Sequence, residues 1–168
     1  MSRSTGAGAV RAVDIEDFVA QHYRRVVGSV ALISGSRAGA EDAVQSALVT
    51  AWERRDEPID KLVAWVTVVA SNEARMRHRR AGAESRALER VGAPTDDGVA
   101  SSEPIDPELV EALSDLPDRE REAVVLHYVH DISVADTADA MGVTPGTVKT
   151  LLSRGRAHLV AALGEADT

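Results

Sequence analysis

Residues 133–159 read SVADTADAMGVTPGTVKTLLSRGRAHL and predict two helices joined by a tight turn. Ser133 is a side-chain cap for the first helix, and Gly142 follows that helix where a left-handed residue commonly ends one. Thr144 caps the second helix, whose first position holds Pro145, a residue that needs no N–H there. The stretch therefore predicts a short helix, a turn and a longer helix.

The spacing within this stretch is typical of a helix-turn-helix. Ala138 is small where the two helices would cross, Gly142 allows the turn four residues later, and Val148 packs the second helix back onto the first. Thr137 stands where an aliphatic residue is more usual. The remaining core positions are Met141, Val143, Leu151, Leu152 and Leu159. Because such a motif places its second helix in the major groove, we expect binding to double-stranded DNA.

Helical periodicity also gives the second helix an outward face. The outward residues, which are candidates for contacts with base edges, are Lys149, Thr150, Ser153 and Arg154. Arg and Lys side chains suit guanine acceptors, whereas Ser and Thr hydroxyls are more permissive. Arg156 and His158 lie further along and suit phosphates. Thr147 and the free amides near Pro145–Gly146 are also suited to holding a phosphate.

Apolar spacing predicts helices over residues 14–34, 38–55 and 61–80 before this motif, and over 107–116 and from Pro117 onward. The helix over 38–55 has a buried stripe made of Ala40, Ala43, Val44, Ala47, Leu48, Ala51 and Trp52. Its other side carries Glu41, Asp42, Gln45 and Ser46, with the apolar Val49 among them. The inward residues of the helix over 61–80 are Leu62, Trp65, Val66 and Val69. Those of the helix from Pro117 onward are Ala123, Val124, Leu126 and Tyr128.

The outward side of the helix over 61–80 is basic. Asn72, Arg75 and Arg79 recur at i, i+3 and i+7 and share one side. Its end carries further basic residues, Arg77, His78, Arg80 and Arg86. Two interpretations stay open on this pattern: a cationic helix end that complements the helix dipole, or a stripe that meets a DNA backbone.

Composition favours an all-α protein of two small helical domains. The chain has 168 residues, few aromatics and little strand-type alternation. Residues 91–107, VGAPTDDGVASSEPIDP, predict a flexible acidic linker between domains at 14–90 and 108–163. The net charge of −8 opposes DNA binding, but residues 91–111 hold six acids and no Lys or Arg. A DNA-binding surface elsewhere is therefore compatible with the charge.

Other features exclude whole classes of protein. There is no cysteine, which excludes disulfides and thiolate zinc sites. No apolar run approaches the roughly 18 residues of a membrane span, and residues 1–13 lack the apolar stretch of a signal peptide, so we expect a cytoplasmic protein. The scattered histidines are His22, His78, His127, His130 and His158. No phosphate loop, nucleophile elbow or carboxylate-rich metal site appears, so we expect no catalysis, cofactor or metal.

Three stretches together resemble the extracytoplasmic-function (ECF) sigma factors of bacterial RNA polymerase. They are AEDAVQSALVTAW (40–52), AWVTVVASNEARMRHRR (64–80) and ALSDLPDREREAVVLHYVHDISVADTADAMGVTPGTVKTLLSRGRAHL (112–159). The resemblance implies that the first domain docks on the clamp of the largest polymerase subunit and opens the minus-ten element. It implies that the second domain reads the minus-thirty-five element as duplex.

Carried over by position, the resemblance assigns roles to individual residues. Asp42 and Gln45 fall on the polymerase-binding helix, which agrees with the exposed place of Val49. Asn72 falls where the family approaches an unstacked base, and Arg75 and Arg79 are its neighbours on the same side. The outward residues Lys149, Thr150, Ser153 and Arg154 fall where the family reads the upstream element.

The chain departs from the family pattern at two places. The loop over residues 54–61, the candidate for holding the extracted base, is short and has no aromatic ring on which a base could stack. Leu151 replaces a basic residue that is common there, which implies one phosphate contact fewer and a shallower salt dependence. A further hypothesis is that the acidic linker, through Asp96, Asp97 and Glu103, mimics DNA against Arg75 and Arg79.

A second class of protein stays open beside the sigma factor. A stand-alone helix-turn-helix regulator, such as the output domain of a response regulator, fits the second half equally well. Residues 1–90, however, lack the strand–turn–helix alternation of a receiver domain. The expected partners are core RNA polymerase and promoter DNA. We expect control either by a separate protein, such as an anti-sigma factor, or by synthesis, and not self-inhibition by an extra domain.

Overall fold

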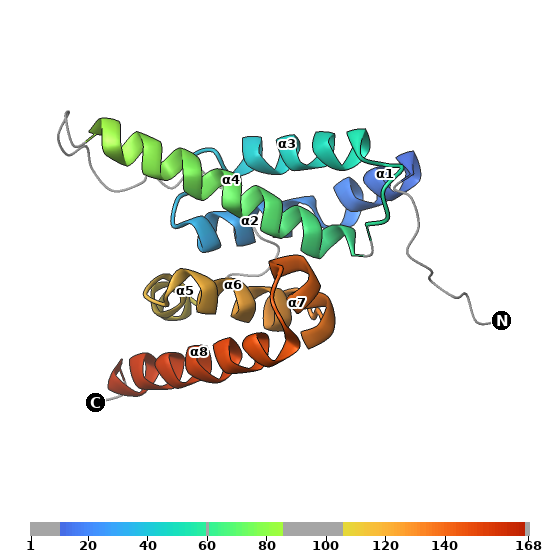
Figure 1. Ribbon diagram of the computed structural model, residues 1–168. Coiled ribbons are helices and arrows are strands. Elements are labelled where there is room, and N and C mark those ends of the chain that lie inside the picture. The colour runs from blue at the N-terminus through green and yellow to red at the C-terminus, as the bar shows by residue number, and fades with distance from the viewer. Residues whose placement is uncertain (1–10, 60, 86–105, 167–168) are drawn as a thin grey trace.

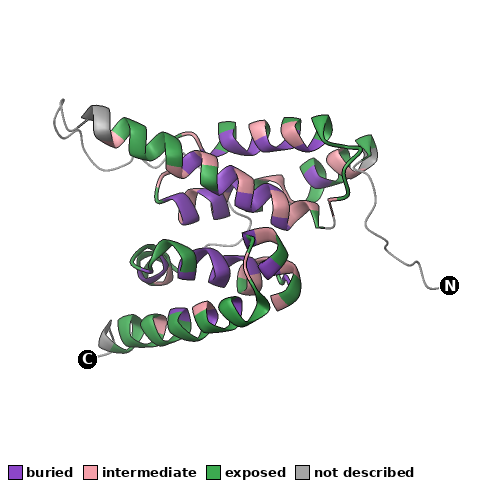
Figure 2. Ribbon diagram, viewed as in Figure 1, coloured by how far each residue is buried: buried purple, intermediate pink, exposed green. Residues whose placement is uncertain are grey.

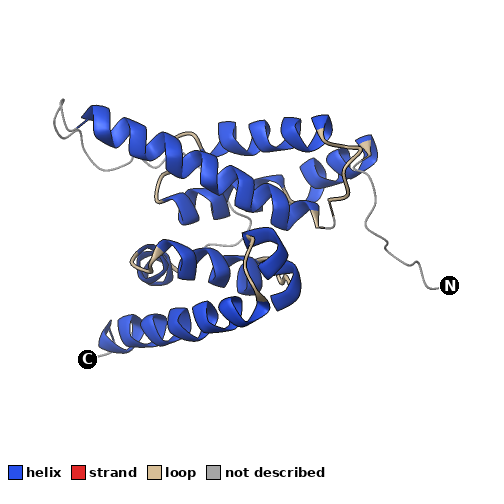
Figure 3. Ribbon diagram, viewed as in Figure 1, coloured by secondary structure: helices blue, strands red, loops and turns tan. Residues whose placement is uncertain are grey.

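A computed structural model describes residues 11–59, 61–85 and 106–166, and the helices there form two layers (Figure 1). No strand occurs within these ranges (Figure 3), which confirms the all-α fold class. The first layer contains α1 (Ala12–Gln21), α2 (Tyr23–Ser34), α3 (Ala40–Glu53) and α4 (Leu62–Ser85). The second contains α5 (Pro107–Ser114), α6 (Asp118–Val124), a π-helical turn η1 (Val125–Val129), α7 (Val134–Met141) and α8 (Pro145–Ala166).

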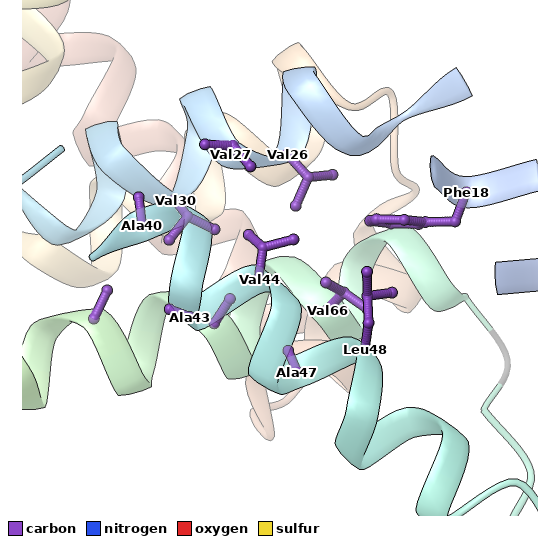
Figure 4. Packing of buried hydrophobic residues seen from close by; sticks show 12 residues of the cluster. Phe18, Val26, Val27, Val30, Ala40, Ala43, Val44, Ala47, Leu48 and Val66 are labelled. Carbon is purple, nitrogen blue, oxygen red and sulfur yellow. The ribbon is translucent and has the colours of Figure 1, made fainter. Parts of the chain in front are cut away.

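The core of the first layer lies between α2, α3 and α4 (Figure 4). Valines of α2 meet the alanine and valine stripe of α3, and Val66 of α4 closes the cluster. The predicted stripe residues of α3 are buried from Ala40 to Ala51. Small side chains let the helices approach closely, which explains how a chain with few aromatics builds this core.

The helix predicted over residues 14–34 is broken in two at His22, so that prediction was wrong. At about 100° per residue, a straight helix would place Phe18 about 80° away from Val26 and about 120° away from Val30. All three side chains are almost fully buried in one cluster. The break at His22, where φ is −123° and ψ is −19°, turns Phe18 toward the same core.

Trp52 was predicted to belong to the buried stripe of α3 but is 42 % exposed. Counted at about 100° per residue, it lies about 80° from Val44 and only about 20° from Gln45. It therefore belongs to the outward side of α3. There the Arg55 guanidinium lies over its ring, 4.9 Å from the centroid.

Helix α4 is buried on two sides along its first half, whereas the sequence predicted one inward side. Val66 packs into the first core, but Ala64 and Val68 belong to the core of the second layer. The outer end of α4 extends past both layers and is exposed (Figure 2). Helix α4 thus contributes, together with α2, to the contact between the two layers.

The second layer contains the predicted helix-turn-helix. The Ser133 hydroxyl accepts from the Asp136 amide at 3.0 Å, and Gly142 ends α7 with φ of 67°. The Thr144 hydroxyl accepts from the Thr147 amide at 3.2 Å, and α8 begins at Pro145. Ala138, Met141, Val148 and Leu152 are buried, and Val143, Leu151 and Leu159 pack partly buried against them. Caps, turn and core are confirmed.

Tyr128 was predicted as core but is half exposed. It lies in η1, where a π-helical turn adds a residue to the repeat and shifts the side chains that follow. The shift turns Tyr128 outward, where its hydroxyl accepts from Arg156 at 2.7 Å. Ala123, Val124 and Leu126 precede or begin this turn and are buried as predicted.

The predicted linker, residues 91–107, lies outside the described residues except at its end. Asp106 is the N-cap of α5, and its carboxylate accepts from the Glu108 amide at 3.0 Å. Pro107 is the first residue of α5. The last two residues of the predicted linker therefore belong to the helix.

We expect Thr137→Val to stabilise the protein by about 1 kcal/mol. Thr137 is fully buried and its hydroxyl has no hydrogen-bond partner, so a methyl group of equal size would remove an unsatisfied group. Thr67→Val is the matched control, because the buried Thr67 hydroxyl donates to the Val63 carbonyl at 2.7 Å. Urea unfolding should show a gain only for Thr137→Val, and equal effects of both substitutions would contradict this explanation.

Candidate nucleic-acid and polymerase interfaces

The outward side of α8 is exposed as predicted. Lys149, Ser153 and Arg154 are exposed, and their side chains make no hydrogen bond or ion pair within the described residues. The Thr150 hydroxyl donates to the Gly146 carbonyl at 3.1 Å, and the Thr147 hydroxyl pairs with that of Thr144. The side chains of Lys149, Ser153 and Arg154 are therefore free to reach base edges.

Two residues further along α8 are held by the second layer. Arg156 donates to Tyr128, and His158 Nδ1 lies 2.7 Å from a carboxylate oxygen of Glu120. Arg156 remains exposed and can meet a phosphate in this orientation. The expected phosphate contact of His158 would require its ring to leave Glu120.

The outward side of α3 carries an exposed acidic and apolar surface, made of Asp42, Gln45, Val49 and Trp52, which we call the α3 surface. Val49 is 57 % exposed, as the sequence predicted. Gln45 is held by Tyr23, whose hydroxyl accepts from the Gln45 amide and donates to Glu41, both at 3.1 Å. Trp52 is the member that the sequence missed, because its spacing also fitted the buried stripe.

The basic side of α4 is only partly open. Asn72 and Arg79 are exposed, as predicted. The Arg75 side chain is 11 % exposed, and its guanidinium lies 3.3 Å from the Glu122 carboxylate of α6. At about 100° per residue Arg75 shares its side of α4 with Ala64 and Val68, which the second layer covers. Of the three residues on this side, Arg75 is therefore covered in this arrangement, whereas Asn72 and Arg79 are open.

A hollow of about 200 Å³ lies beside the loop that precedes α4. Its walls are Pro58, Ile59, Lys61, Ala64 and Trp65 from the first layer, and Asp136, Asp139 and Ala140 from α7. The loop itself has no aromatic residue, but Trp65 supplies a ring next to it. The sequence had assigned Trp65 only to the inward side.

Comparisons with known proteins match both layers. The family described as Sigma-70 region 2 matches residues 18–84, and Sigma-70, region 4 matches residues 107–159. RNA polymerase sigma factor CarQ of Myxococcus xanthus is 32 % identical over 161 residues, which cover 90 % of each chain. ECF RNA polymerase sigma factor SigM of Mycobacterium tuberculosis is 33 % identical over 153 residues, covering 88 % of this chain and 76 % of SigM.

The chain belongs to the ECF sigma factors. Sigma factors bind core RNA polymerase and promoter DNA, and they direct promoter recognition and transcription initiation without being enzymes. A similar solved structure is the sigma factor RpoE in complex with the anti-sigma factor NepR from Bartonella quintana. It has a TM-score of 0.69 and 26 % identity, and the match covers 90 % of this chain and 97 % of that one. The similarity therefore extends over both layers.

The described residues contain neither a membrane-spanning helix nor a metal site. Among them, no helix is both long enough and apolar enough to cross a membrane. In the same ranges no group of three or more His, Cys, Asp or Glu side chains is arranged to hold a metal ion.

The two layers of the sigma factor are joined by a buried guanidinium that the sequence did not single out. Arg121 of α6 donates to the carbonyls of Leu113, Ser114 and Leu116 at 2.6–2.9 Å, at the end of α5. It also donates to the Ile33 carbonyl at 2.9 Å, at the end of α2. Burial lowers the pKa of Arg121, although the carbonyls and Asp118 favour its charge. One side chain thus satisfies the free carbonyls of two helix ends, one from each layer.

Two further polar contacts cross between the layers. Arg25 of α2 donates to the Val129 carbonyl, and the His130 Nε2 lies 2.7 Å from the Ser29 hydroxyl. Burial, together with the charges of Arg25 and His22, lowers the pKa of His130 from 6.5 to about 4. His130 is therefore neutral in the folded protein at neutral pH.

We expect the free energy of unfolding to decrease, because of His130, as the pH falls from about 6.5 to about 4. The unfolded chain takes up a proton near 6.5 that the folded protein takes up only near 4, so the contribution of His130 is complete above 6.5. A pKa difference of this size corresponds to about 3 kcal/mol. His130→Gln should flatten this pH dependence in urea unfolding, whereas His78→Gln, at an exposed position, should not. An NMR titration with His130 near 6.5 would contradict the expectation.

Proposed function

We propose that this sigma factor divides promoter recognition between its layers. In this proposal α8 reads the minus-thirty-five element with Lys149, Ser153 and Arg154, while Thr147, Thr150 and Arg156 assist at phosphates and methyl groups. The observation that supports it is that the side chains of Lys149, Ser153 and Arg154 are exposed and have no partner within the described residues. They lie on a capped helix whose other side is buried. A helix presented in this way is suited to the major groove.

In the first layer, which the sequence bounds at residues 14–90, we assign the minus-ten element to α4 and to the loop before it. Asn72 is exposed and lies about two turns after Trp65 on the same side of α4. Stacking an unpaired base on an aromatic ring contributes about 1–3 kcal/mol, enough to offset part of the cost of extracting it. Trp65 thus compensates for the missing aromatic in the loop. Arg79, and Arg75 when uncovered, would hold the strand's phosphates.

The α3 surface is our candidate for docking on the clamp of the largest polymerase subunit. An exposed Trp and Val beside an acid make a small apolar centre with a charged rim, which is the usual composition of a binding surface. We further propose that the protein works in the cytoplasm, has no catalytic activity of its own, and is controlled by a separate anti-sigma factor. The last point is supported by the similarity to an RpoE that binds NepR.

Arg154→Ala and Arg156→Ala test the division of roles along α8. Loss of a base contact by Arg154→Ala should weaken holoenzyme binding by about 1–3 kcal/mol and relax the preference at one base pair. Loss of a phosphate contact by Arg156→Ala should weaken binding to all sequences and reduce the salt slope by about 1. Fluorescence anisotropy on duplexes with single substitutions measures both. Identical base preferences in the wild type and Arg154→Ala would contradict the assignment.

A further inference from the structure

Tyr23 joins the core of the first layer to the exposed side of α3. It is the first residue of α2 and directly follows the break at His22. Its ring packs partly buried against the first core, whereas its hydroxyl hydrogen-bonds to Glu41 and Gln45, two exposed residues of α3. A Tyr side chain suits this place, because it has an apolar body and a polar tip. The sequence had given Tyr23 no role, since its partners lie 18 and 22 positions away.

The two hydrogen bonds of the Tyr23 hydroxyl have a fixed direction. The Glu41 carboxylate, as an anion, can only accept, so the hydroxyl proton is directed to Glu41. Burial, together with Glu41, raises the pKa of Tyr23, although the hydrogen bond from Gln45 opposes this, so the hydroxyl keeps its proton at neutral pH. The Tyr23 oxygen therefore accepts from Gln45, which must present its amide nitrogen and not its amide oxygen.

This direction turns the amide oxygen of Gln45 away from Tyr23. Within the described residues that oxygen accepts no hydrogen bond. At about 100° per residue, Gln45 lies about 20° from Trp52, about 40° from Val49 and about 60° from Asp42. Gln45 is thus the central member of the α3 surface, and the residues that contribute most to binding commonly lie near the centre of an interface.

We propose that Tyr23 is a positioning residue for binding to core polymerase, because its hydroxyl holds the Gln45 side chain with the amide oxygen directed at the clamp. The inference rests on the proposed docking of the α3 surface and adds a residue that lies behind that surface. A long, flexible side chain loses rotamer freedom when it is fixed in an interface, which reduces affinity. Tyr23 fixes Gln45 before the polymerase binds, so less freedom is lost on docking.

Tyr23→Phe removes the hydroxyl and keeps the ring. We expect it to lower the affinity for core polymerase about fivefold, which corresponds to about 1 kcal/mol, the contribution of about one hydrogen bond. Anisotropy of the labelled full chain titrated with core measures the affinity. An unchanged affinity would overturn the proposal.

Tyr128→Phe is the matched control for this loss of a hydroxyl. The Tyr128 hydroxyl accepts from Arg156 in the second layer, and Tyr128 is the other tyrosine of the chain. The substitution should leave the affinity for core unchanged. Both variants should unfold at the same urea concentration as the wild type, because each keeps its ring. Equal weakening of binding by both variants would mean that the loss is not specific to the α3 surface, and the proposal would be wrong.

Gln45→Ala separates positioning from a merely structural role. If Tyr23 acts through Gln45, Tyr23→Phe should lower the affinity about fivefold in the wild type and should have no further effect in a chain that already carries Gln45→Ala. A structural role of the hydroxyl would lower the affinity equally in both chains. Equal effects would therefore overturn the proposal.

Glu41→Gln tests the direction of the hydrogen bonds without touching Tyr23. Glu41 is exposed, so the substitution should not affect folding. A neutral amide can donate as well as accept, so the Tyr23 proton is no longer held toward position 41 and Gln45 can turn over. We expect the side-chain amide resonances of Gln45 in nitrogen–proton spectra of the full chain to shift in Glu41→Gln and in Tyr23→Phe. Unchanged resonances in either variant would overturn the proposal.

The titrations with core also distinguish this inference from the docking on which it rests. If Asp42→Arg combined with Val49→Asp leaves the affinity unchanged, the α3 surface is not the docking surface, and the inference fails with it. If that double variant weakens binding but Tyr23→Phe does not, the docking surface stands and only the role of Tyr23 is wrong.

Discussion

Gly155→Leu is expected to destabilise the helix-turn-helix layer and to lower its free energy of unfolding by about 3 kcal/mol or more. Gly155 is buried where α8 crosses α6, and a Cβ atom there would lie 2.7 Å from Cγ2 of Val124. Val124 is itself buried and β-branched, so it has no free rotamer into which to move. The leucine side chain would therefore force the two helices apart. Urea unfolding followed by far-UV circular dichroism measures the loss.

Gly164→Ala is the matched control in the same helix. A Cβ atom at Gly164 would have no atom within 4 Å, so only helix propensity changes. That change is worth up to about 1 kcal/mol in favour of alanine. If Gly155→Leu proved as stable as the wild type, the close packing of α6 on α8 would be wrong.

Asp42→Arg combined with Val49→Asp is expected to reduce affinity for core polymerase at least thirtyfold. The pair reverses the charge and removes the apolar centre of the α3 surface, and both side chains are exposed. The fold should be intact, because the stripe from Ala40 to Ala51 packs on the opposite side. Thirtyfold corresponds to about 2 kcal/mol, which is the size of a hot-spot contact. Anisotropy of the labelled sigma factor titrated with core measures it.

Glu111→Arg makes the same reversal of charge as Asp42→Arg at an exposed position on α5. It should leave the affinity for core unchanged. Equal weakening by both variants would mean that total charge, and not the α3 surface, governs binding. Trp52→Ala extends the test to the residue that the structure added to this surface.

Local signals in the sequence predicted the elements well. Capping residues and the turn glycine act within a few positions, so the amino-acid sequence alone suffices to assign Ser133, Gly142 and Thr144. The buried stripe of α3 followed from periodicity for the same reason. Exposed residues such as Val49 and Lys149 were predicted correctly because they lie on the side of each helix opposite its buried residues.

The errors arose where one position satisfies two patterns or where a distant partner decides. Trp52 fits the edge of both sides of α3, and Tyr128 lies in a π-helical turn that no local residue type predicts. The ion pair of Arg75 with Glu122 joins residues 47 positions apart in different layers, so no spacing along one helix reveals it. The contact of Arg121 with the end of α2 is missed for the same reason.

Run-off transcription with core polymerase, with and without the protein, on a pool of promoters from its own genome is the most direct test of its role in promoter recognition. We expect transcripts that appear only when the protein is added and that disappear with Asp42→Arg. No added transcript, together with selection of a duplex site by the protein alone, would contradict this role and would indicate a stand-alone helix-turn-helix regulator.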